Sequence, residues 1–160
     1  MPKRSTLEEA ERQLIMQLYP TLRRIAAVAG PVEMEPDDLV QEALVRTLGR
    51  RKLTELDNPT AYLRATIVNL ASNHRRGLAR RRRAVARLST DDGWVPSYPS
   101  DVEAILDLPP RQRAILYLVE VEGVPYAEAA DQLGMTTVAA RALANRARRK
   151  ARVNLEVGNA

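Results

Sequence analysis

Arginine is the residue type whose spacing says most about the chemistry of this chain. Seven arginines fall within residues 75–87, RRGLARRRRAVAR. Residues 1–74 hold ten basic and ten acidic side chains, residues 75–100 hold seven and two, and residues 101–160 hold eight and eight, so the net charge of +5 lies in the central segment. Focused positive charge attracts a polyanion. The segment lacks the bulky apolar face of an interfacial membrane helix, so nucleic acid is favoured over a membrane surface or a merely solvated basic run.

A second basic cluster closes the chain. Residues 126–152, YAEAADQLGMTTVAARALANRARRKAR, have the layout of a helix-turn-helix with Gly134 in the turn. Thr136 or Thr137 is placed to cap the second helix and to donate to a phosphate. Arg141 and Asn145, one turn apart, are placed to reach base edges. The side chains expected to hold phosphates are Arg146, Arg148, Arg149, Lys150 and Arg152. A helix pair in a plain bundle is the alternative interpretation.

Catalytic and metal-binding chemistry finds little support. The chain has no cysteine and one histidine, His74, which excludes thiolate nucleophiles, disulfides and a histidine-rich metal site. The acids Asp37, Asp38 and Glu42 lie near the start of a predicted helix, where acids already favour the helix dipole. We therefore expect no catalytic residue, no metal and no cofactor.

Proline and glycine divide the chain into helical windows with almost no strand signal, which predicts an all-α fold. The first helix opens at Ser5 or Thr6 with a capping box, is kinked or split at Pro20, and ends at Gly30. The next helices run from Pro36 to about Gly49, and from Asn58 into the arginine block. Further helices are predicted near 101–107, 110–122, 125–133 and 136–155.

Residues 88–100 have no helical or strand period and are rich in Ser, Asp, Gly and Pro, which predicts a flexible linker. The chain therefore divides into two small helical domains, residues 1–87 and 101–160, the second with the helix-turn-helix. No stretch approaches the ~20 apolar residues of a membrane span, and the N-terminus lacks the apolar core of a secretory signal, so we expect the protein in the cytoplasm.

The faces of two helices carry further information. In the helix from Pro36, one side is apolar and the other charged. The expected core residues are Leu39, Val40, Ala43, Leu44, Thr47 and Leu48; Val45 lies alone within the charged face, as in a helix that docks on a partner. In the helix from Pro59, the core side is Tyr62, Leu63, Thr66, Ile67 and Leu70. The opposite side, Arg64, Val68, Ser72, Arg75 and Arg76, would lie along a phosphate backbone, with Ala61 and Ala65 allowing close approach. We expect a packed or half-exposed His74 at the apolar edge.

Three segments in order resemble a known family. DDLVQEALVRTLGR at 37–50, NPTAYLRATIVNLASNHRR at 58–76 and LPPRQRAILYLVEVEGVPYAEAADQLGM at 108–135 resemble bacterial RNA polymerase sigma factors of the extracytoplasmic-function (ECF) type. The resemblance implies a factor that binds core RNA polymerase, directs it to specific promoters and promotes DNA opening, with no enzymatic activity of its own. Core polymerase and promoter DNA are the implied partners. An anti-sigma protein is a further candidate partner, because family members often have one.

The resemblance also implies roles for particular residues. The clamp helices of the largest polymerase subunit would be bound by Asp38, Gln41, Glu42, Val45 and Arg46. The melted minus-ten element would be captured by Arg51, Lys52, Asn58, Tyr62, Arg64, Asn69, Asn73, Arg75 and Arg76, with Tyr62 placed to stack on a base. The minus-thirty-five element would be bound by Thr136, Thr137, Arg141, Asn145, Arg146, Arg148 and Arg149. The linker, with Asp91, Asp92 and Trp94, would thread the polymerase between them.

Some positions depart from the family pattern. Pro59 and Tyr62 stand where Phe and Trp are usual, Asn73 where Asp is usual, and Leu143 where a basic side chain is common. Arg141 is left as the expected base reader. The sequence leaves two alternative functions. A free-standing dimeric DNA-binding regulator would use only the helix-turn-helix and leaves Val45 and the arginine block unexplained. An enzyme acting on nucleic acid lacks any supporting constellation.

Overall fold

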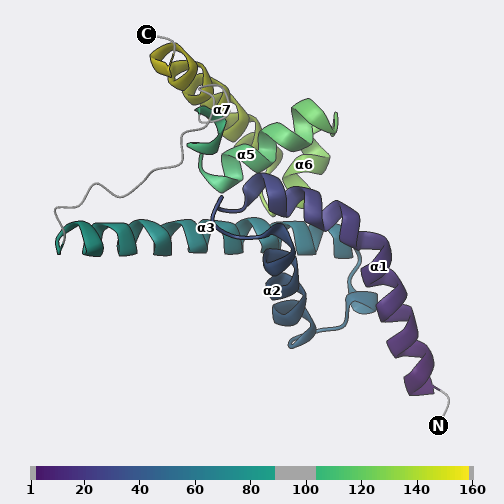
Figure 1. Ribbon diagram of the computed structural model, residues 1–160. Helices are drawn as coiled ribbons and strands as arrows, with labels where there is room; N and C mark the ends of the chain where they lie inside the picture. The colour runs from purple at the N-terminus through teal and green to yellow at the C-terminus, as the bar shows by residue number, and fades with distance from the viewer. Residues whose placement is uncertain (1–2, 89–103, 159–160) are drawn as a thin grey trace.

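The computed structural model describes residues 3–88 and 104–158, and every regular element within them is helical (Figure 1), which confirms the all-α fold class. The predicted linker, with Asp91, Asp92 and Trp94, lies almost wholly outside the described residues. The first part of the chain holds α1 (Lys3–Ala29), α2 (Pro36–Leu48), the short 3₁₀ turn η1 (Leu53–Glu55) and α3 (Pro59–Ala86). The second part holds α5 (Pro110–Leu116), the π-helical turn η2 (Tyr117–Val121), α6 (Tyr126–Gln132) and α7 (Thr137–Gly158).

Most helices begin where local signals place them. Asn58 caps α3, its Oδ1 accepting from the backbone N–H of Ala61 at 3.0 Å, and Pro36 occupies the first turn of α2. Thr136 caps α7 through a 3.2 Å bond from the N–H of Ala139. At α1, Pro20 was expected to kink or split the helix, and the structure excludes a split. Pro20 lies inside a continuous helix that already begins at Lys3, because the side chains that follow it are buried in the core and hold the helix together.

The apolar faces of α1, α2 and α3 meet in a tight core. Leu22, Ile25, Leu39, Leu63 and Ile67 are all completely buried. Burying each such side chain stabilises the fold by about 1.5–3 kcal/mol. The assignment of Leu48 to this core was wrong, since the residue is 41% exposed. Leu48 is the last residue of α2, where the covered stretch of that helix ends.

The second part of the chain packs directly on the first, and one hydrophobic cluster spans both. In Figure 1, α5 lies against α1 and α3, and α6 lies against α3. Ile115 and Leu118, both completely buried, belong to the same cluster as Leu22 and Ile67. One hydrophobic core is therefore shared by the two predicted helical domains. The sequence does not predict this sharing, because helical periodicity identifies an apolar face but not the other helices that cover it.

Two residues of α3 show this most clearly. Arg64 and Val68 were expected on the outward side of the helix, yet they are 4% and 2% exposed. That side of α3 faces α5 and α6 rather than solvent. The prediction that Arg64 and Val68 point outward was wrong, because it treated the first domain as if it stood alone.

A buried arginine from the second part closes the end of α1. The Nη2 of Arg113 donates to the carbonyl oxygens of Ala29 at 2.8 Å and Gly30 at 2.9 Å, and its Nη1 donates to the carbonyl of Leu106 at 2.6 Å. Carbonyls at a helix C-terminus have no partner within the helix, so this guanidinium satisfies groups that would otherwise be buried unpaired. Burial, and then the nearby charge of Arg75, lower the pKa of Arg113 to about 10, so it stays charged at neutral pH.

We expect Arg113→Ala to lower the free energy of unfolding by about 2–4 kcal/mol, because hydrogen bonds to a charged group are lost and the helix-end carbonyls stay buried. Urea denaturation followed by circular dichroism measures the change. The matched control is Arg111→Ala, which removes an exposed guanidinium with one side-chain bond, to Asn69, and should cost less than about 0.5 kcal/mol. Equal losses for the two variants would show that Arg113 has no special role.

Candidate protein and nucleic-acid interfaces

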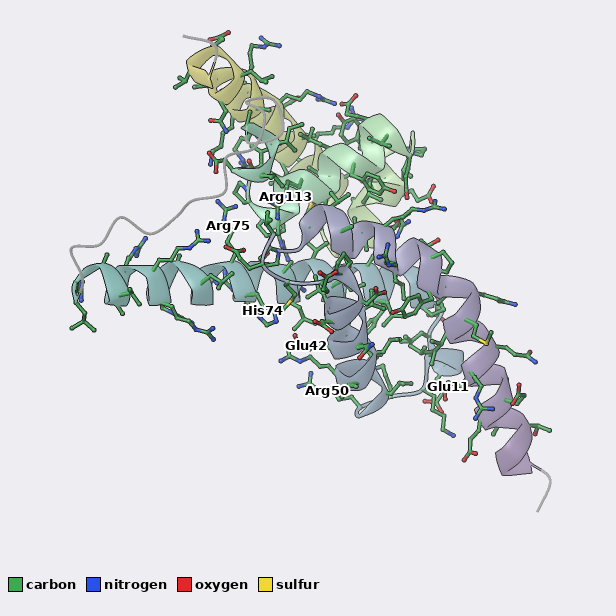
Figure 2. All side chains as sticks on the ribbon, viewed as in Figure 1. Glu11, Glu42, Arg50, His74, Arg75 and Arg113 are labelled. Carbon is green, nitrogen blue, oxygen red and sulfur yellow. The ribbon has the colours of Figure 1, made fainter. Side chains whose placement is uncertain are left out.

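The outward face of α2 is mostly open. Val45 is 73% exposed, and Asp38, Gln41 and Arg46 are exposed beside it. Glu42 is the exception, because its Oε2 lies 2.6 Å from Nε2 of His74 on α3, and Figure 2 shows the two side chains directed toward each other. His74 is half-buried, as expected. The face therefore combines a fixed carboxylate with an uncovered valine, a surface suited to a protein partner.

The acids at the start of α2 have a structural role. Asp37 accepts from the hydroxyl of Tyr19 at 2.8 Å and from Nε of Arg23 at 3.2 Å, which ties α2 to α1. The hydrogen bond from Tyr19, followed by the contacts with Arg23, holds the pKa of Asp37 below its ordinary value. Within residues 3–88 and 104–158, no three histidine or acidic side chains come together as a metal site would require.

Three of the cationic or polar residues expected to bind single-stranded DNA contact the second part of the chain instead. Arg64 donates to both carboxylate oxygens of Glu122 at 3.1 Å, and to Gln132. The Oδ1 of Asn69 accepts from Arg111 at 2.8 Å, and Nη2 of Arg75 donates to the carbonyl of Asp107 at 3.0 Å. In this arrangement those side chains are committed to contacts within the protein.

The remaining members of that set lie around the loop between α2 and α3 and along the exposed side of α3. The guanidinium of Arg51 lies over the ring of Tyr62, 5.4 Å from its centroid, and Lys52 is exposed. Asn73, also exposed, accepts from Arg76. Glu11 of α1 accepts from the backbone N–H groups of Leu53 and Thr54, which fixes the loop from the outside.

A small cavity of about 150 Å³ opens between the end of α2 and α3. The residues that line it are Arg46, Thr47, Arg50, Tyr62, Thr66, Asn69 and Leu70. Two of them, Tyr62 and Asn69, were expected to bind a melted strand. Arg50 and Thr66 were not, although the cluster Arg50-Arg51-Lys52 directly after a helix end was a visible signal. Cations, an aromatic ring and amide and hydroxyl groups together suit a polar, planar ligand of negative charge.

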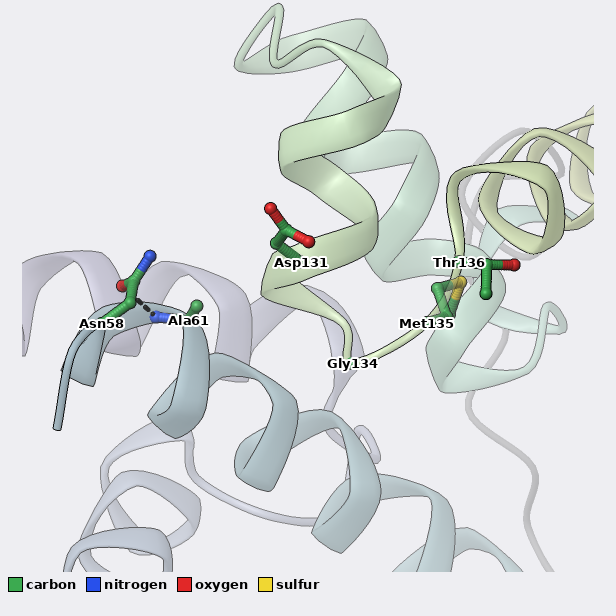
Figure 3. Close-up of a pocket in the computed structure, with 6 residues that line it drawn as sticks. All are labelled: Asn58, Ala61, Asp131, Gly134, Met135 and Thr136. Carbon is green, nitrogen blue, oxygen red and sulfur yellow. Dashed lines mark hydrogen bonds between the residues drawn. The ribbon is translucent and has the colours of Figure 1, made fainter.

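A larger groove, of about 500 Å³, lies where the two parts of the chain meet (Figure 3). Asn58 and Ala61 line it from the start of α3, and Asp131, Gly134, Met135 and Thr136 line it from the helix-turn-helix. Gly134 has a φ of +63°, which a residue with a side chain adopts only at a cost. A Cβ built there would lie 4.0 Å from that of Ala65. The small residues of α3 thus let this turn approach, where the sequence had suggested a phosphate backbone.

The helix-turn-helix is organised around Tyr126, which the sequence analysis did not single out. The guanidinium of Arg141 lies 5.0 Å from the centroid of its ring. The hydroxyl of Tyr126 accepts a hydrogen bond from Nη2 of Arg148 at 2.7 Å, and Nε of Arg148 donates to Glu120 at 2.9 Å. The hydrogen bonds to Glu120 and then Tyr126 raise the pKa of Arg148 above its ordinary value.

The other helix-turn-helix residues expected to contact DNA are more open. Arg146 and Arg149 are exposed. Asn145 is exposed and accepts from Nη1 of Arg148 at 3.1 Å. Thr137 is the first residue of α7 and is partly exposed. The helix therefore presents a mixed set of exposed polar and cationic side chains, with Arg148 the one most engaged inside the protein.

Comparison with known proteins gives two kinds of match. Residues 14–82 match the family described as Sigma-70 region 2, and residues 102–150 match Sigma-70, region 4. The chain is also similar in fold to a sigma factor, RpoE of Bartonella quintana, solved in complex with the anti-sigma factor NepR. That match has a TM-score of 0.63 and 19% identity, and covers 91% of this chain and 96% of the other. No curated protein sequence gives a significant match.

Within the described residues no helix is long and apolar enough to span a membrane.

We expect Tyr19→Phe to raise the pKa of Asp37 toward its ordinary value, because the hydroxyl that stabilises the carboxylate is removed. Titration of the carboxyl carbon by NMR measures it. A carboxyl group whose pKa is lower in the folded protein stabilises the fold at pH values above its ordinary pKa. This stabilisation is lost as the pH falls through the pKa of the folded state, so the stability advantage of wild type over Tyr19→Phe should shrink in acid. Tyr62→Phe, on α3, is the control and should leave the titration of Asp37 unchanged. An unshifted Asp37 in Tyr19→Phe would contradict this assignment.

Proposed function

The chain belongs to the sigma-70 family of bacterial transcription initiation factors, and from that premise we propose that it is a sigma factor of the extracytoplasmic-function type. Regions 2 and 4 occur in order and together account for most of the chain. A sigma-70 factor binds core RNA polymerase and directs transcription initiation at promoters. The observation that carries the proposal is this order of the two regions, which are joined by the segment of residues 83–101.

The division of labour follows the two matches. Residues 1–87 form the region 2 domain, residues 88–100 the linker and residues 101–160 the region 4 domain. The first contacts core polymerase and the minus-ten element, and the second contacts the minus-thirty-five element. The polymerase performs the chemistry, and this protein itself is no enzyme. It acts in the cytoplasm, where the bacterial polymerase and the chromosome are.

The outward face of α2 is the polymerase-binding surface. Its members are Asp38, Gln41, Glu42, Val45 and Arg46. An exposed valine ringed by polar side chains is the arrangement of an apolar anchor within a polar rim. Because His74 fixes Glu42, one rim carboxylate is already oriented before binding, which reduces the entropy lost when the complex forms.

The minus-ten element is captured by the loop after α2 and by α3. Arg51, Lys52, Asn58, Asn73 and Arg76 supply cations and polar groups. Tyr62, beside the 150 Å³ cavity, supplies the stacking surface for an unpaired base. Extruding a base from the duplex costs a few kcal/mol, which these contacts must offset.

The remaining three minus-ten residues, Arg64, Asn69 and Arg75, are held by the second part of the chain. We infer that they contact DNA only after the two domains separate. The arrangement described here is then the closed form of the factor. RpoE, which has a similar fold, was solved in complex with an anti-sigma factor. As the regulatory partner of this chain we propose an anti-sigma protein that favours the closed form.

The helix-turn-helix binds the minus-thirty-five element, with α7 in the major groove. Arg141, oriented by the ring of Tyr126, reads a base edge. Thr136, Thr137, Asn145, Arg146, Arg148 and Arg149 complete the contact set. In vitro transcription with the purified chain, core polymerase and a promoter library tests the whole proposal. Initiation at a defined sequence is the expected result, and its absence with every promoter would refute it.

We expect Val45→Asp to weaken binding to core polymerase by about tenfold or more, because a charge replaces the apolar centre of the surface. Fluorescence anisotropy of the labelled chain titrated with core enzyme measures the affinity. The matched control is Met16→Asp, since Met16 is 70% exposed on α1 and lies outside the proposed surface. Circular dichroism should show both variants folded. Equal affinities of the two variants for core polymerase would show that the polymerase contacts a different surface of the protein.

We expect Arg141→Ala to cost about 1–3 kcal/mol of binding at a minus-thirty-five site with a guanine at the contacted position, and much less where that guanine is replaced. Promoter binding by the reconstituted holoenzyme measures both. Arg146→Ala is the control, and it should weaken every promoter alike, as a phosphate contact does. A uniform loss for Arg141→Ala would assign it to phosphate instead.

A further inference from the structure

The first turns of α7 present an apolar side chain to solvent. Val138, the second residue of this helix, is 78% exposed. Ala139 and Ala142 beside it are exposed as well. An exposed valine adds little to the core, and it lowers the helix propensity relative to alanine. The stability of α7 therefore gives no reason for a valine at this position.

Val138 lies at the centre of the outward face of α7. At about 100° per residue, Ala147 points in the opposite direction, and it is completely buried. Asn145 lies within about 20° of Val138 around the helix axis, and Arg141 within about 60°. Both of these polar residues are exposed. Val138 thus shares one face with the two side chains that we expect to reach base edges.

This face is open in the arrangement described here. The helix packs on α5 and α6, and the side chains that it buries completely include Ala140, Ala144 and Ala147. Arg64 of α3, in contrast, is covered by the second part of the chain. Val138 therefore needs no separation of the two domains to become accessible.

The charges around Val138 differ from those around Val45 of α2. The face that contains Val45 carries both acidic and basic side chains, which suits a protein surface of mixed charge. Residues 137–152 contain no acid, and the exposed side chains near Val138 include Arg141 and Arg146. Cations without neighbouring acids attract a polyanion. The charge pattern therefore favours DNA over a second protein as the partner of this face.

Duplex DNA offers an apolar group to such a side chain. In the major groove the C5 position of thymine carries a methyl group, whereas the other bases are distinguished there by hydrogen-bonding groups. The residues at the N-terminus of a recognition helix are those that contact base edges. A valine that packs against the methyl group removes apolar surface of both partners from water. An apolar contact of this kind distinguishes thymine from the other bases.

We propose that Val138 is a specificity-determining residue that packs against the methyl group of one thymine in the minus-thirty-five element. This inference rests on the proposed function, since it takes α7 to be the recognition helix. Val138 supplies an apolar contact to base recognition, and Arg141, one turn further along, supplies a hydrogen-bonding contact. The element should therefore contain an A·T pair whose thymine methyl group contributes to binding.

The experiment removes the methyl group from the DNA and the valine from the protein, separately and together. The probe is a promoter at which the wild-type chain directs initiation with core polymerase. Each thymine of its minus-thirty-five element, on both strands, is replaced in turn by deoxyuridine, which lacks only the methyl group. The protein variant is Val138→Ala. Affinity of the reconstituted holoenzyme for each duplex is measured at one fixed salt concentration, and binding to core polymerase is measured in parallel.

The matched control is Val157→Ala. Val157 is 73% exposed and lies on the same helix, about 28 Å further along its axis. The control variant should bind every duplex as wild type does. Circular dichroism should show both variants folded, because neither valine is part of the core.

With wild type, one deoxyuridine substitution should lower the affinity of the holoenzyme about 4-fold, because one buried methyl contact is lost. Val138→Ala should lower the affinity for the unmodified promoter by about 4-fold or more. With this variant the same deoxyuridine should have little further effect, since both changes remove one contact. Binding to core polymerase should stay at the wild-type level.

Other outcomes overturn the inference. If no deoxyuridine weakens binding by wild type, or the element contains no A·T pair, Val138 contacts no thymine methyl group. If Val138→Ala retains the full effect of deoxyuridine, a different side chain makes the contact. If Val138→Ala weakens binding to core polymerase instead, the valine belongs to a protein interface. Failure of wild type to initiate at any defined sequence would refute the proposed function, whereas absence of the methyl effect alone leaves that function standing.

Discussion

Two buried arginines, one from each part of the chain, connect the two parts. Arg64 of α3 forms an ion pair with Glu122 and donates to Gln132 of the second part, and Arg113 of α5 donates to carbonyls at the end of α1. Burying a guanidinium costs free energy, which its hydrogen bonds and ion pairs must offset. Because each arginine finds its partners across the boundary, the relative position of the two parts is specified by hydrogen-bond geometry.

These contacts define the geometry between the two parts without making their separation costly. Burying an ion pair requires both charges to lose their hydration, and this loss offsets most of their attraction. When the two parts separate, Arg64 and Glu122 both regain water, so little free energy is lost from that pair. Several members of the shared hydrophobic cluster are alanines, including Ala71, Ala114 and Ala129, and each buries little apolar area. Precise geometry combined with a modest opening cost would suit the separation of the two domains that we propose.

Arginine has three distinct roles in this fold, each set by its surroundings. Arg113 is desolvated and acts as the cap of a neighbouring helix. Arg141 lies over the ring of Tyr126, where a planar cation and an aromatic face stabilise one rotamer. Arg83 is solvated on an exposed helical arm. Composition alone treats these three as equal positive charges, whereas their burial decides which are available to a polyanion.

Local rules were enough to derive the all-α class, most helix boundaries, a cap at Thr136 or Thr137, and the exposed Val45, because each depends on residues within a few positions along the chain. The family was also recognisable from short motifs. Packing between distant segments decided the rest. Arg64 and Val68 lie on the polar side of α3 by periodicity and become buried only because α5 and α6 cover them. Only the structure shows that the ring of Tyr126 lies against Arg141 and that its hydroxyl accepts from Arg148. Periodicity reports the two sides of one helix, whereas burial depends on every other helix that comes to lie against it.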